Sequence, residues 1–283
     1  MAQAGKRRLA YGFWRYREGD LDAALAMLSA ARESGIDHLD TADVYGGKGA
    51  SERILGELRK RAPSLFAGAF LASKGGVEKG VPYNSSAASI GAACDGSLSR
   101  LGVERLDLYY VHRPDLLTHP AELAATLDGL VAAGKVGAIG VSNFSVAQIS
   151  ALSRYMKAPI VAHQLQFSAS HFAPLFDGTL DLAMERDMAV AAWSPLAGGR
   201  LGEGGPPEYA RVREALVTFA AKYGVAPAAI AFAYLHRHPA AVTPIVGSRT
   251  PERLREAVQG ASIELTRADW YRILESGLGS AMP

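Results

Sequence analysis

The order of apolar and polar positions along the chain predicts a regular succession of short strands and longer helices. Short apolar runs alternate with segments whose apolar residues recur at helical spacing. The runs expected to be strands are residues 9–14, 36–39, 69–73, 106–111, 136–141, 160–165, 189–193 and 242–246. The segments expected to be helical are residues 20–35, with Asp20 as N-cap, and 51–60, 87–101, 120–134, 146–155, 181–186 (the end of a helix), 209–223, 227–236, 251–258 and 269–274.

This alternation indicates the α/β class and, within it, one (β/α)8 TIM barrel with eight parallel strands. A succession of strand and helix implies a parallel sheet, and a count near eight implies that the sheet closes. Residues 106–111 are apolar almost throughout, as expected of a strand buried on both faces. No change of composition marks a linker, so we expect a single domain over residues 1–283.

Composition and charge argue against several other classes of protein. The chain has 49% hydrophobic and 20% charged residues, close to the globular average. Its formal net charge is +2, with no dense basic run beyond Lys6-Arg7-Arg8, so neither nucleic-acid nor membrane binding is expected. The single Cys94 fits a reducing compartment. Because residues 1–10 lack a signal-peptide core and no apolar run reaches membrane length, we expect a cytoplasmic protein.

Motifs of other cofactor and metal proteins are missing from the sequence. There is no Gly-x-Gly-x-x-Gly of a Rossmann domain, no P-loop and no His-Glu-x-x-His. The segment His236-Arg-His238 resembles the His-x-His that metal-dependent barrel hydrolases carry on their first strand, but here it ends a helix before the last strand. We therefore expect no metal site.

Polar side chains that suit carbonyl chemistry follow three of the expected strands. Asp40 follows the strand at 36–39 and Tyr45 comes shortly after it, Lys74 follows 69–73, and His112 follows 106–111. Since chemistry in such barrels lies on the loops after the carboxyl ends of the strands, we expect these four side chains at one end of the barrel. A carboxylate, a phenol, an amine and an imidazole are the groups needed to protonate a carbonyl oxygen.

The segments around these residues resemble the motifs of the aldo-keto reductase family. In chain order they are His38-Leu-Asp40-Thr-Ala-Asp-Val-Tyr45-Gly, Ala72-Ser-Lys74, Leu108-Tyr-Tyr-Val-His112-Arg-Pro, Gly140-Val-Ser142-Asn143-Phe, Gln164, Trp193-Ser194-Pro-Leu196 and Ile245-Val-Gly247-Ser248-Arg249-Thr-Pro-Glu-Arg253. They extend over most of the chain, and each lies at the end of an expected strand. The resemblance implies an NADPH-dependent reductase whose partner is a small-molecule aldehyde or ketone.

The resemblance also implies that Asp40, Tyr45, Lys74 and His112 form a catalytic tetrad. Hydride attack leaves negative charge on the carbonyl oxygen, and Tyr45 is expected to donate the proton that meets it. Because an ammonium favours the phenolate, Lys74 is expected to lower the tyrosine pKa from its ordinary value of about 10. Asp40 would keep Lys74 charged and oriented, and a neutral His112 would hydrogen-bond the substrate oxygen. Trp14 is expected to line the substrate pocket beside Tyr45 and His112.

A cofactor-binding set is implied in the same way. Ser142, Asn143 and Gln164 would bind the nicotinamide carboxamide, and the Trp193 ring would stack on the nicotinamide. The glycine-containing segment 194–201 would approach the pyrophosphate, and arginines beside the helix at 251–258 would hold the adenosine 2′-phosphate. The full expected set is Ser142, Asn143, Gln164, Trp193, Ser194, Leu196, Gly198, Arg200, Gly247, Ser248, Arg249 and Arg253.

The sequence departs from the family pattern in several places. Few residues precede Leu9, so the hairpin that usually comes before the first barrel strand is expected to be shortened or missing. Trp193 stands where many members have Tyr. Gly247 stands where many NADPH-dependent members have Lys. This difference weakens the expectation of NADPH over NADH but does not reverse it. The tail after Leu274 is short, which would leave the substrate pocket open on that side.

Other interpretations stay open at the level of sequence. Asp40 and Lys74 alone could form a structural ion pair, and Arg249 and Arg253 could be ordinary solvated residues. A cofactor-binding sensor or accessory subunit of reductase ancestry would bind NADPH and turn over no carbonyl. A phosphate-binding barrel lyase or isomerase would not bind NADPH. The sequence makes no prediction of the physiological substrate or the oligomeric state.

Overall fold

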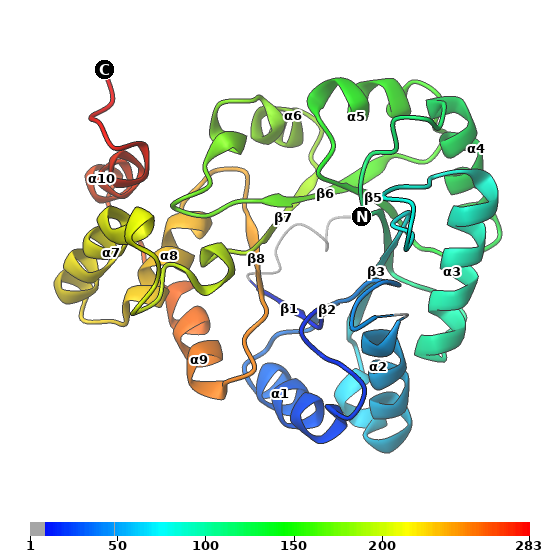
Figure 1. The fold of residues 1–283 in the computed structure, drawn as a ribbon, viewed down its shortest axis with the longest axis horizontal. Coiled ribbons are helices and arrows are strands. Elements are labelled where there is room, and N and C mark those ends of the chain that lie inside the picture. Colours follow the sequence, from blue (N-terminus) through cyan, green and yellow to red (C-terminus); the bar gives the residue numbers. More distant parts are fainter. Residues whose placement is uncertain (1–8, 48) are drawn as a thin grey trace. The chain divides into compact units, whose positions relative to one another are not determined.

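A computed structural model describes residues 9–47 and 49–283. Its strands are hydrogen-bonded in chain order and form a closed barrel (Figure 1). They are β1 (Ala10–Gly12), β2 (His38–Asp40), β3 (Phe70–Gly75), β4 (Leu108–Val111), β5 (Ile139–Ser142), β6 (Ile160–Gln166), β7 (Ala189–Trp193) and β8 (Thr243–Val246). The pairs from β2 to β6 and the pair of β7 with β8 are parallel. The predicted eight-stranded TIM barrel is confirmed.

Helices follow the strands, and caps or prolines in the sequence begin several of them. The helices are α1 (Leu21–Glu33), α2 (Ala50–Arg61), α3 (Ala87–Leu101), α4 (Pro120–Ala132), α5 (Val146–Ser153), α6 (Thr179–Glu185), α7 (Ala210–Tyr223), α8 (Pro227–His236), α9 (Pro251–Gly260) and α10 (Arg267–Leu278). Short 3₁₀ segments are η2 (Pro63–Phe66), η3 (Ala173–Leu175), η4 (Ala197–Gly199) and η5 (Pro207–Tyr209). At α5, Ser145 and Gln148 form a capping box, which satisfies amides that a helix start leaves unpaired.

Every expected strand and helix is present, and the differences lie at the ends. The bounds of α3, α8 and β7 are the expected ones. Several strands begin later than expected: β4 starts at Leu108 because Leu106, although buried, only bridges Val136. Asp20 occupies the N-cap position of α1, as expected. Its carboxylate makes no cap bond to the helix and instead accepts the Arg17 amide at 2.8 Å.

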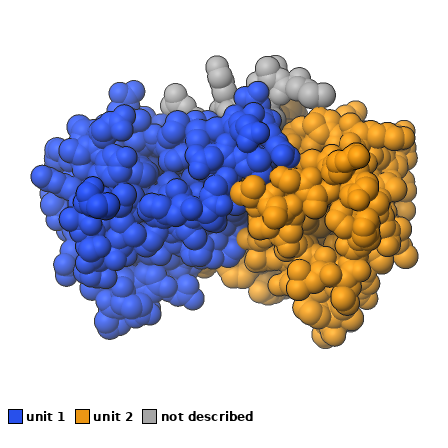
Figure 2. Space-filling view, turned by 90° about the horizontal axis from the view of Figure 1, so that it is seen from above, with its two compact units in different colours: residues 1–10, 165–283 blue, residues 11–164 orange. Residues whose placement is uncertain are grey.

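The chain divides into two compact units (Figure 2). One is Tyr11–Gln164, which contains β2 to β5 and α1 to α5; the other is Leu165–Pro283 together with the segment ending at Ala10, and contains β7, β8 and α6 to α10. The boundaries fall inside β1 and β6. The interpretation of residues 1–283 as one domain stays a prediction.

Close packing between α2 and α3 fixes the outer side of β3. Gly56 of α2 lies against the carbonyl of Arg100, so a methyl group there would overlap with the α3 backbone. Gly75 at the end of β3 lies under the Tyr109 hydroxyl of β4, where a side chain would also overlap. These contacts hold β3 and its last residues in place from outside.

Three expectations concern the chain ends, membranes and metals. The shortened or missing hairpin and the basic run Lys6-Arg7-Arg8 lie outside the described residues. In residues 9–47 and 49–283, no single helix is long and apolar enough to cross a membrane. The bent pair Pro207–Tyr223 and Pro227–His236 meets the length and composition test only when its two members are taken together across a 93° bend. The same residues contain no group of three or more His, Cys, Asp or Glu side chains that could hold a metal ion.

Candidate active site

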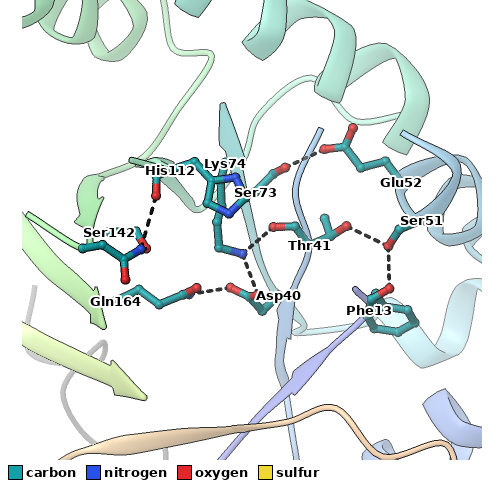
Figure 3. A network of polar contacts seen from close by, with 11 residues as sticks. Phe13, Asp40, Thr41, Ser51, Glu52, Ser73, Lys74, His112, Ser142 and Gln164 are labelled. Atoms are coloured by element: carbon teal, nitrogen blue, oxygen red, sulfur yellow. Dashed lines mark hydrogen bonds and ion pairs between the residues drawn. The ribbon is translucent and has the colours of Figure 1, made fainter. Parts of the chain in front are cut away.

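The Lys74 ammonium is the centre of the site in the unit Tyr11–Gln164. Its side chain is fully buried at the end of β3 and donates to Asp40 Oδ1 at 2.6 Å and to the Thr41 carbonyl at 2.7 Å (Figure 3). Burial alone lowers the pKa of Lys74, but Asp40 and Tyr45 outweigh burial and raise it above its ordinary value. The amine is therefore charged at neutral pH, as expected of a cation that stabilises a neighbouring phenolate.

Asp40 is held from two sides. Its Oδ1 accepts from Lys74, and its Oδ2 accepts from the Gln164 amide nitrogen at 2.8 Å. Both side chains are buried; Asp40 is the last residue of β2, and Gln164 lies two residues before the end of β6. The carboxylate is thus fixed in orientation and aims the Lys74 ammonium. Sequence reasoning assigned Gln164 to the cofactor and missed this bond to Asp40.

Tyr45 lies in the turn after β2, beside Lys74 and His112. The Lys74 nitrogen lies 4.8 Å from the centroid of the Tyr45 ring. The ring packs edge-to-face against the His112 imidazole, with centroids 5.5 Å apart. Two backbone hydrogen bonds hold the turn, from the Asp43 amide to the Lys74 carbonyl and from the Ser51 amide to the Tyr45 carbonyl. The structure therefore brings all four predicted catalytic side chains together.

The pKa of Tyr45 differs in direction from the expectation. Burial raises the pKa above 10, Lys74 lowers it, and Asp40 raises it again, so the net direction is upward. Lys74 acts in the expected direction, but desolvation of the phenolate outweighs the attraction of the ammonium. Tyr45 therefore holds its proton at neutral pH, the state that a proton donor requires.

His112 is neutral, as expected. Burial, together with the nearby Lys74 and Arg113 cations, lowers its pKa to about 3. Its backbone amide donates to the Gly75 carbonyl at 2.8 Å, which fixes the residue at the end of β4. The imidazole Nδ1 is buried and has no hydrogen-bond partner among the described residues. A neutral ring carries one N–H that can donate to a substrate oxygen.

Part of the predicted cofactor set lies in this same unit, on β5 and β6. Asn143 follows β5 in the left-handed conformation, with φ of 60°. Its side-chain nitrogen donates to Ser142 Oγ at 2.7 Å and to the His112 carbonyl at 3.4 Å. The Asn143 amide donates to the Gln164 carbonyl at 2.9 Å. These bonds place Ser142, Asn143 and Gln164 together beside His112.

The rest of the cofactor set lies in the other unit, at the ends of β7 and β8. Trp193 ends β7 and packs against the buried cluster of Ala10, Ala191 and Ile245. Beyond it the backbone takes positive φ at Ser194 (53°), Ala197 (50°), Gly198 (71°) and Gly199 (100°). Positive φ is costly for Ser and Ala, and such strained backbone is concentrated at functional sites. Turns of this kind direct successive amides toward an anion.

After β8, the predicted phosphate-binding residues surround the start of α9. Ser248 Oγ accepts the Thr250 amide at 3.1 Å, and Pro251 opens the helix. Arg249 and Arg253 are exposed on either side of this helix start. The N-cap Thr250 side chain makes no cap bond to α9.

Three further members of the predicted set lie in these loops. Leu196 precedes η4, and Gly247 follows β8. Arg200 donates to the Ala197 carbonyl at 3.4 Å and so braces the turn after β7. The roles assigned to the cofactor set stay predictions.

Trp14, expected in the substrate pocket, lies in the loop after β1. Its side chain is 50% exposed, and the Arg15 guanidinium lies 5.3 Å from its ring centroid. Within the described part of the chain, its ring contacts the Arg15 guanidinium and its carbonyl accepts from Arg17 Nη1, and neither contact joins it to Tyr45 or His112. Its pocket role stays a prediction.

Sequence reasoning missed a buried polar network around the tetrad. Its further members are Phe13, Thr41, Ser51, Glu52 and Ser73 (Figure 3). The Thr41 and Ser51 hydroxyls share a hydrogen bond at 3.0 Å, and Ser51 also donates to the Phe13 carbonyl. The segment Ala50-Ser51-Glu52 at the start of α2 matches no familiar catalytic motif. Its place in the network becomes visible only from its burial.

Comparisons with known proteins show the family of this chain. The model of the Aldo/keto reductase family matches residues 8–277. A 6-dehydroglucose reductase of Novosphingobium aromaticivorans is 39% identical, over 97% of this chain and 93% of the relative. A protein of the same name from Agrobacterium fabrum is 34% identical, over 96% of this chain and 94% of the relative.

Solved structures show the same fold. The crystal structure of the thermostable aldo-keto reductase Tm1743, in complex with the inhibitor epalrestat, superposes with a TM-score of 0.83 at 24% identity, covering 95% of each chain. With a family match over nearly its whole length and relatives above 30% identity, this chain is an oxidoreductase and belongs to the aldo/keto reductase family.

Proposed function

We propose that the protein reduces an aldehyde or ketone to an alcohol with NADPH, using Tyr45 as the proton donor. The observation that carries this proposal is the buried Lys74 ammonium, which is held by Asp40 and lies 4.8 Å from the Tyr45 ring centroid. A buried cation beside a protonated phenol can stabilise the phenolate that remains after proton transfer.

The side chains divide the reaction between them. When bound, NADPH supplies the hydride that adds to the carbonyl carbon. The Tyr45 O–H bond breaks as its proton passes to the carbonyl oxygen, and the phenolate charge is balanced by Lys74. His112, neutral and packed on Tyr45, donates a hydrogen bond to the same oxygen and orients it. Asp40 keeps the ammonium in place.

Two features of the chain fit the cofactor. In the unit Tyr11–Gln164, Ser142, Asn143 and Gln164 present hydroxyl and amide groups that would bind the nicotinamide carboxamide. In the other unit, the strained backbone from Ser194 to Gly199 offers amides that suit a pyrophosphate.

The start of α9 suits the adenosine 2′-phosphate of the cofactor. Arg249 and Arg253 stand beside a helix N-terminus, which favours a phosphate group through both guanidinium forks and amide dipoles. We prefer NADPH to NADH because only NADPH carries the 2′-phosphate that these arginines would bind.

The names of the relatives suggest the substrate to test first. Two relatives, at 39% and 34% identity, are named 6-dehydroglucose reductase. We therefore propose a sugar aldehyde of this kind as substrate, reduced at its carbonyl carbon to the primary alcohol.

The test is NADPH oxidation, followed by absorbance, with 6-dehydroglucose and a panel of aldehydes and ketones, and with NADH in parallel. We expect turnover with NADPH and a kcat/KM at least about tenfold lower with NADH, the equivalent of about 1.4 kcal/mol from contacts to the 2′-phosphate. NADPH binding without turnover of any carbonyl would instead support a sensor or accessory subunit. Absence of NADPH binding would refute the proposal as a whole.

A further inference from the structure

A second group of polar side chains lies behind Lys74, on the outer face of β3 and β4. We call it the outer cluster; its members are Asp43, Glu52, Ser73, Arg100 and Tyr109. Because successive strand residues face opposite sides, Ser73 points away from the face that carries Lys74. Glu52 is fully buried and accepts from Ser73 Oγ at 2.5 Å and from Arg100 Nε at 2.7 Å (Figure 3 shows the Ser73 bond).

Glycines give Arg100 its access to Glu52. A side chain at Gly49, just before α2, or at Gly96 of α3 would overlap with the Arg100 guanidinium. The chain therefore makes room for one arginine at this place. That arginine supplies the positive charge that a fully buried Glu52 carboxylate requires.

Of the three carboxyl groups near Lys74, Asp43 is the one without an ion-pair partner among the described residues. Asp40 is paired with Lys74, and Glu52 is paired with Arg100. No ion pair to Asp43 is recorded among the described residues, and its Oδ1 is buried without a hydrogen-bond partner there. A buried carboxyl group without its own cation favours the neutral form.

The surroundings of Asp43 act in the same direction. Burial and the Glu52 carboxylate of α2 together raise its pKa to about 7, against the opposing effects of Arg100 of α3, the Val44 amide and Lys74 of β3. From β4, Tyr109 faces the cluster with a buried hydroxyl that has no partner among the described residues, and Cys94 of α3 lies near that hydroxyl.

The backbone of Asp43 connects this cluster to the proton donor. The Asp43 amide donates to the Lys74 carbonyl at 3.1 Å, and the Tyr45 amide donates to the Ala42 carbonyl at 3.1 Å. One short turn thus carries Asp43 toward the outer cluster and Tyr45 toward Lys74. Asp43 and Tyr45 therefore belong to the same turn, between the end of β2 and the start of α2.

We propose that Asp43 is a positioning residue, which as a neutral acid holds residues 41–46 against the outer cluster and so keeps Tyr45 beside Lys74. Ionised Asp43 is repelled by the buried Glu52 carboxylate, and the turn moves away from the cluster. Turnover therefore falls as the pH rises through about 7. This inference rests on the proposed function, because it takes Tyr45 as the proton donor.

The test compares Asp43→Asn, which keeps the shape and cannot ionise, with Asp43→Ala, which removes the carboxyl group. Asp107→Asn is the matched control, since that carboxylate accepts the Leu71 amide at the opposite end of β3. The pH dependence of kcat is measured with saturating NADPH and the best carbonyl substrate of the panel. Infrared difference spectra against Asp43→Asn detect the protonated carboxyl group without any turnover.

We expect a fall in wild-type and Asp107→Asn kcat near neutral pH that is absent in Asp43→Asn. We also expect Asp43→Ala to lose kcat by tenfold or more at every pH, since misplacement by about 1 Å can cost about a hundredfold. Coincident pH profiles of wild type and Asp43→Asn, or full activity of Asp43→Ala, would overturn the proposal. So would the absence of a protonated Asp43 band below neutral pH, a result that stands even if the chain reduces no carbonyl and the proposed function fails.

Discussion

Replacement of Lys74 by Met tests how strongly the buried ion pair depends on both partners. The Lys74 and Asp40 side chains are 0% and 3% exposed, with 2.6 Å between Nζ and Oδ1. Removal of the ammonium leaves a buried carboxylate that, within residues 9–47 and 49–283, accepts from one other side chain, Gln164. Loss of one partner from a buried pair costs about 3–5 kcal/mol, so Lys74→Met should lower the free energy of unfolding by this amount at pH 7.

The loss of stability should depend on pH because the unpaired Asp40 carboxylate can bind a proton in the variant. Without Lys74, the carboxyl group can become neutral by binding a proton, and an aspartate in the unfolded chain has a pKa of about 3.9. Protonation at pH 7 therefore costs about 1.4 kcal/mol for each of about three units, roughly 4 kcal/mol, but only about 1.5 kcal/mol at a pH near 5. A group with a raised folded-state pKa loses stability as pH rises, so the deficit of the variant should grow from pH 5 to pH 7.

The assay is urea unfolding followed by circular dichroism at both pH values. The double variant Asp40→Asn with Lys74→Met removes both charges and should recover most of the stability, since neither buried charge is left alone. A loss below about 1 kcal/mol at pH 7 would refute the reasoning, as would an equal loss at both pH values or a double variant no more stable than Lys74→Met.

Two further predictions concern the unit Leu165–Pro283. Combined Arg249→Ala and Arg253→Ala substitutions should weaken NADPH binding by about tenfold or more and leave NADH binding nearly unchanged, as measured by fluorescence titration; equal losses for both cofactors would contradict the phosphate role. Asp269→Ala should cost about 2–3 kcal/mol in urea unfolding, because the carboxylate accepts from Lys222 at 2.7 and 2.8 Å and from the Tyr223 hydroxyl at 2.6 Å. Burial alone raises the pKa of Asp269, but the bonds from Lys222 and Tyr223 bring it down to about 2, so this contribution is present above pH 4 and the difference from wild type should shrink as the pH falls toward 2.

Local sequence patterns predicted the order of elements and the four central side chains. Apolar spacing and prolines located helices such as α8, and the polar residues at strand ends located Asp40, Lys74 and His112. Strand starts were less accurate because apolar residues such as Leu106 are buried before the regular ladder begins. An apolar pattern predicts which residues are buried, whereas the first residue of a strand depends on hydrogen bonds to a neighbouring strand.

The partners of the tetrad could not be predicted in the same way. Gln164 reaches Asp40 only because strands far apart in sequence end at the same level. The burial of Glu52 depends on Arg100 passing beside Gly49 and Gly96, a contact between two helices that no local pattern reports. The upward shift in the pKa of Tyr45 likewise depends on how completely the turn is buried.

The most direct test of the account is the substitution Tyr45→Phe, which removes the hydroxyl and keeps the ring that packs on His112. NADPH affinity and the free energy of unfolding should stay close to those of wild type. The kcat for carbonyl reduction should fall by about a hundredfold or more, the contribution expected of a positioned general acid. A variant that reduces the same carbonyl at the wild-type rate would contradict the claim that Tyr45 donates the proton.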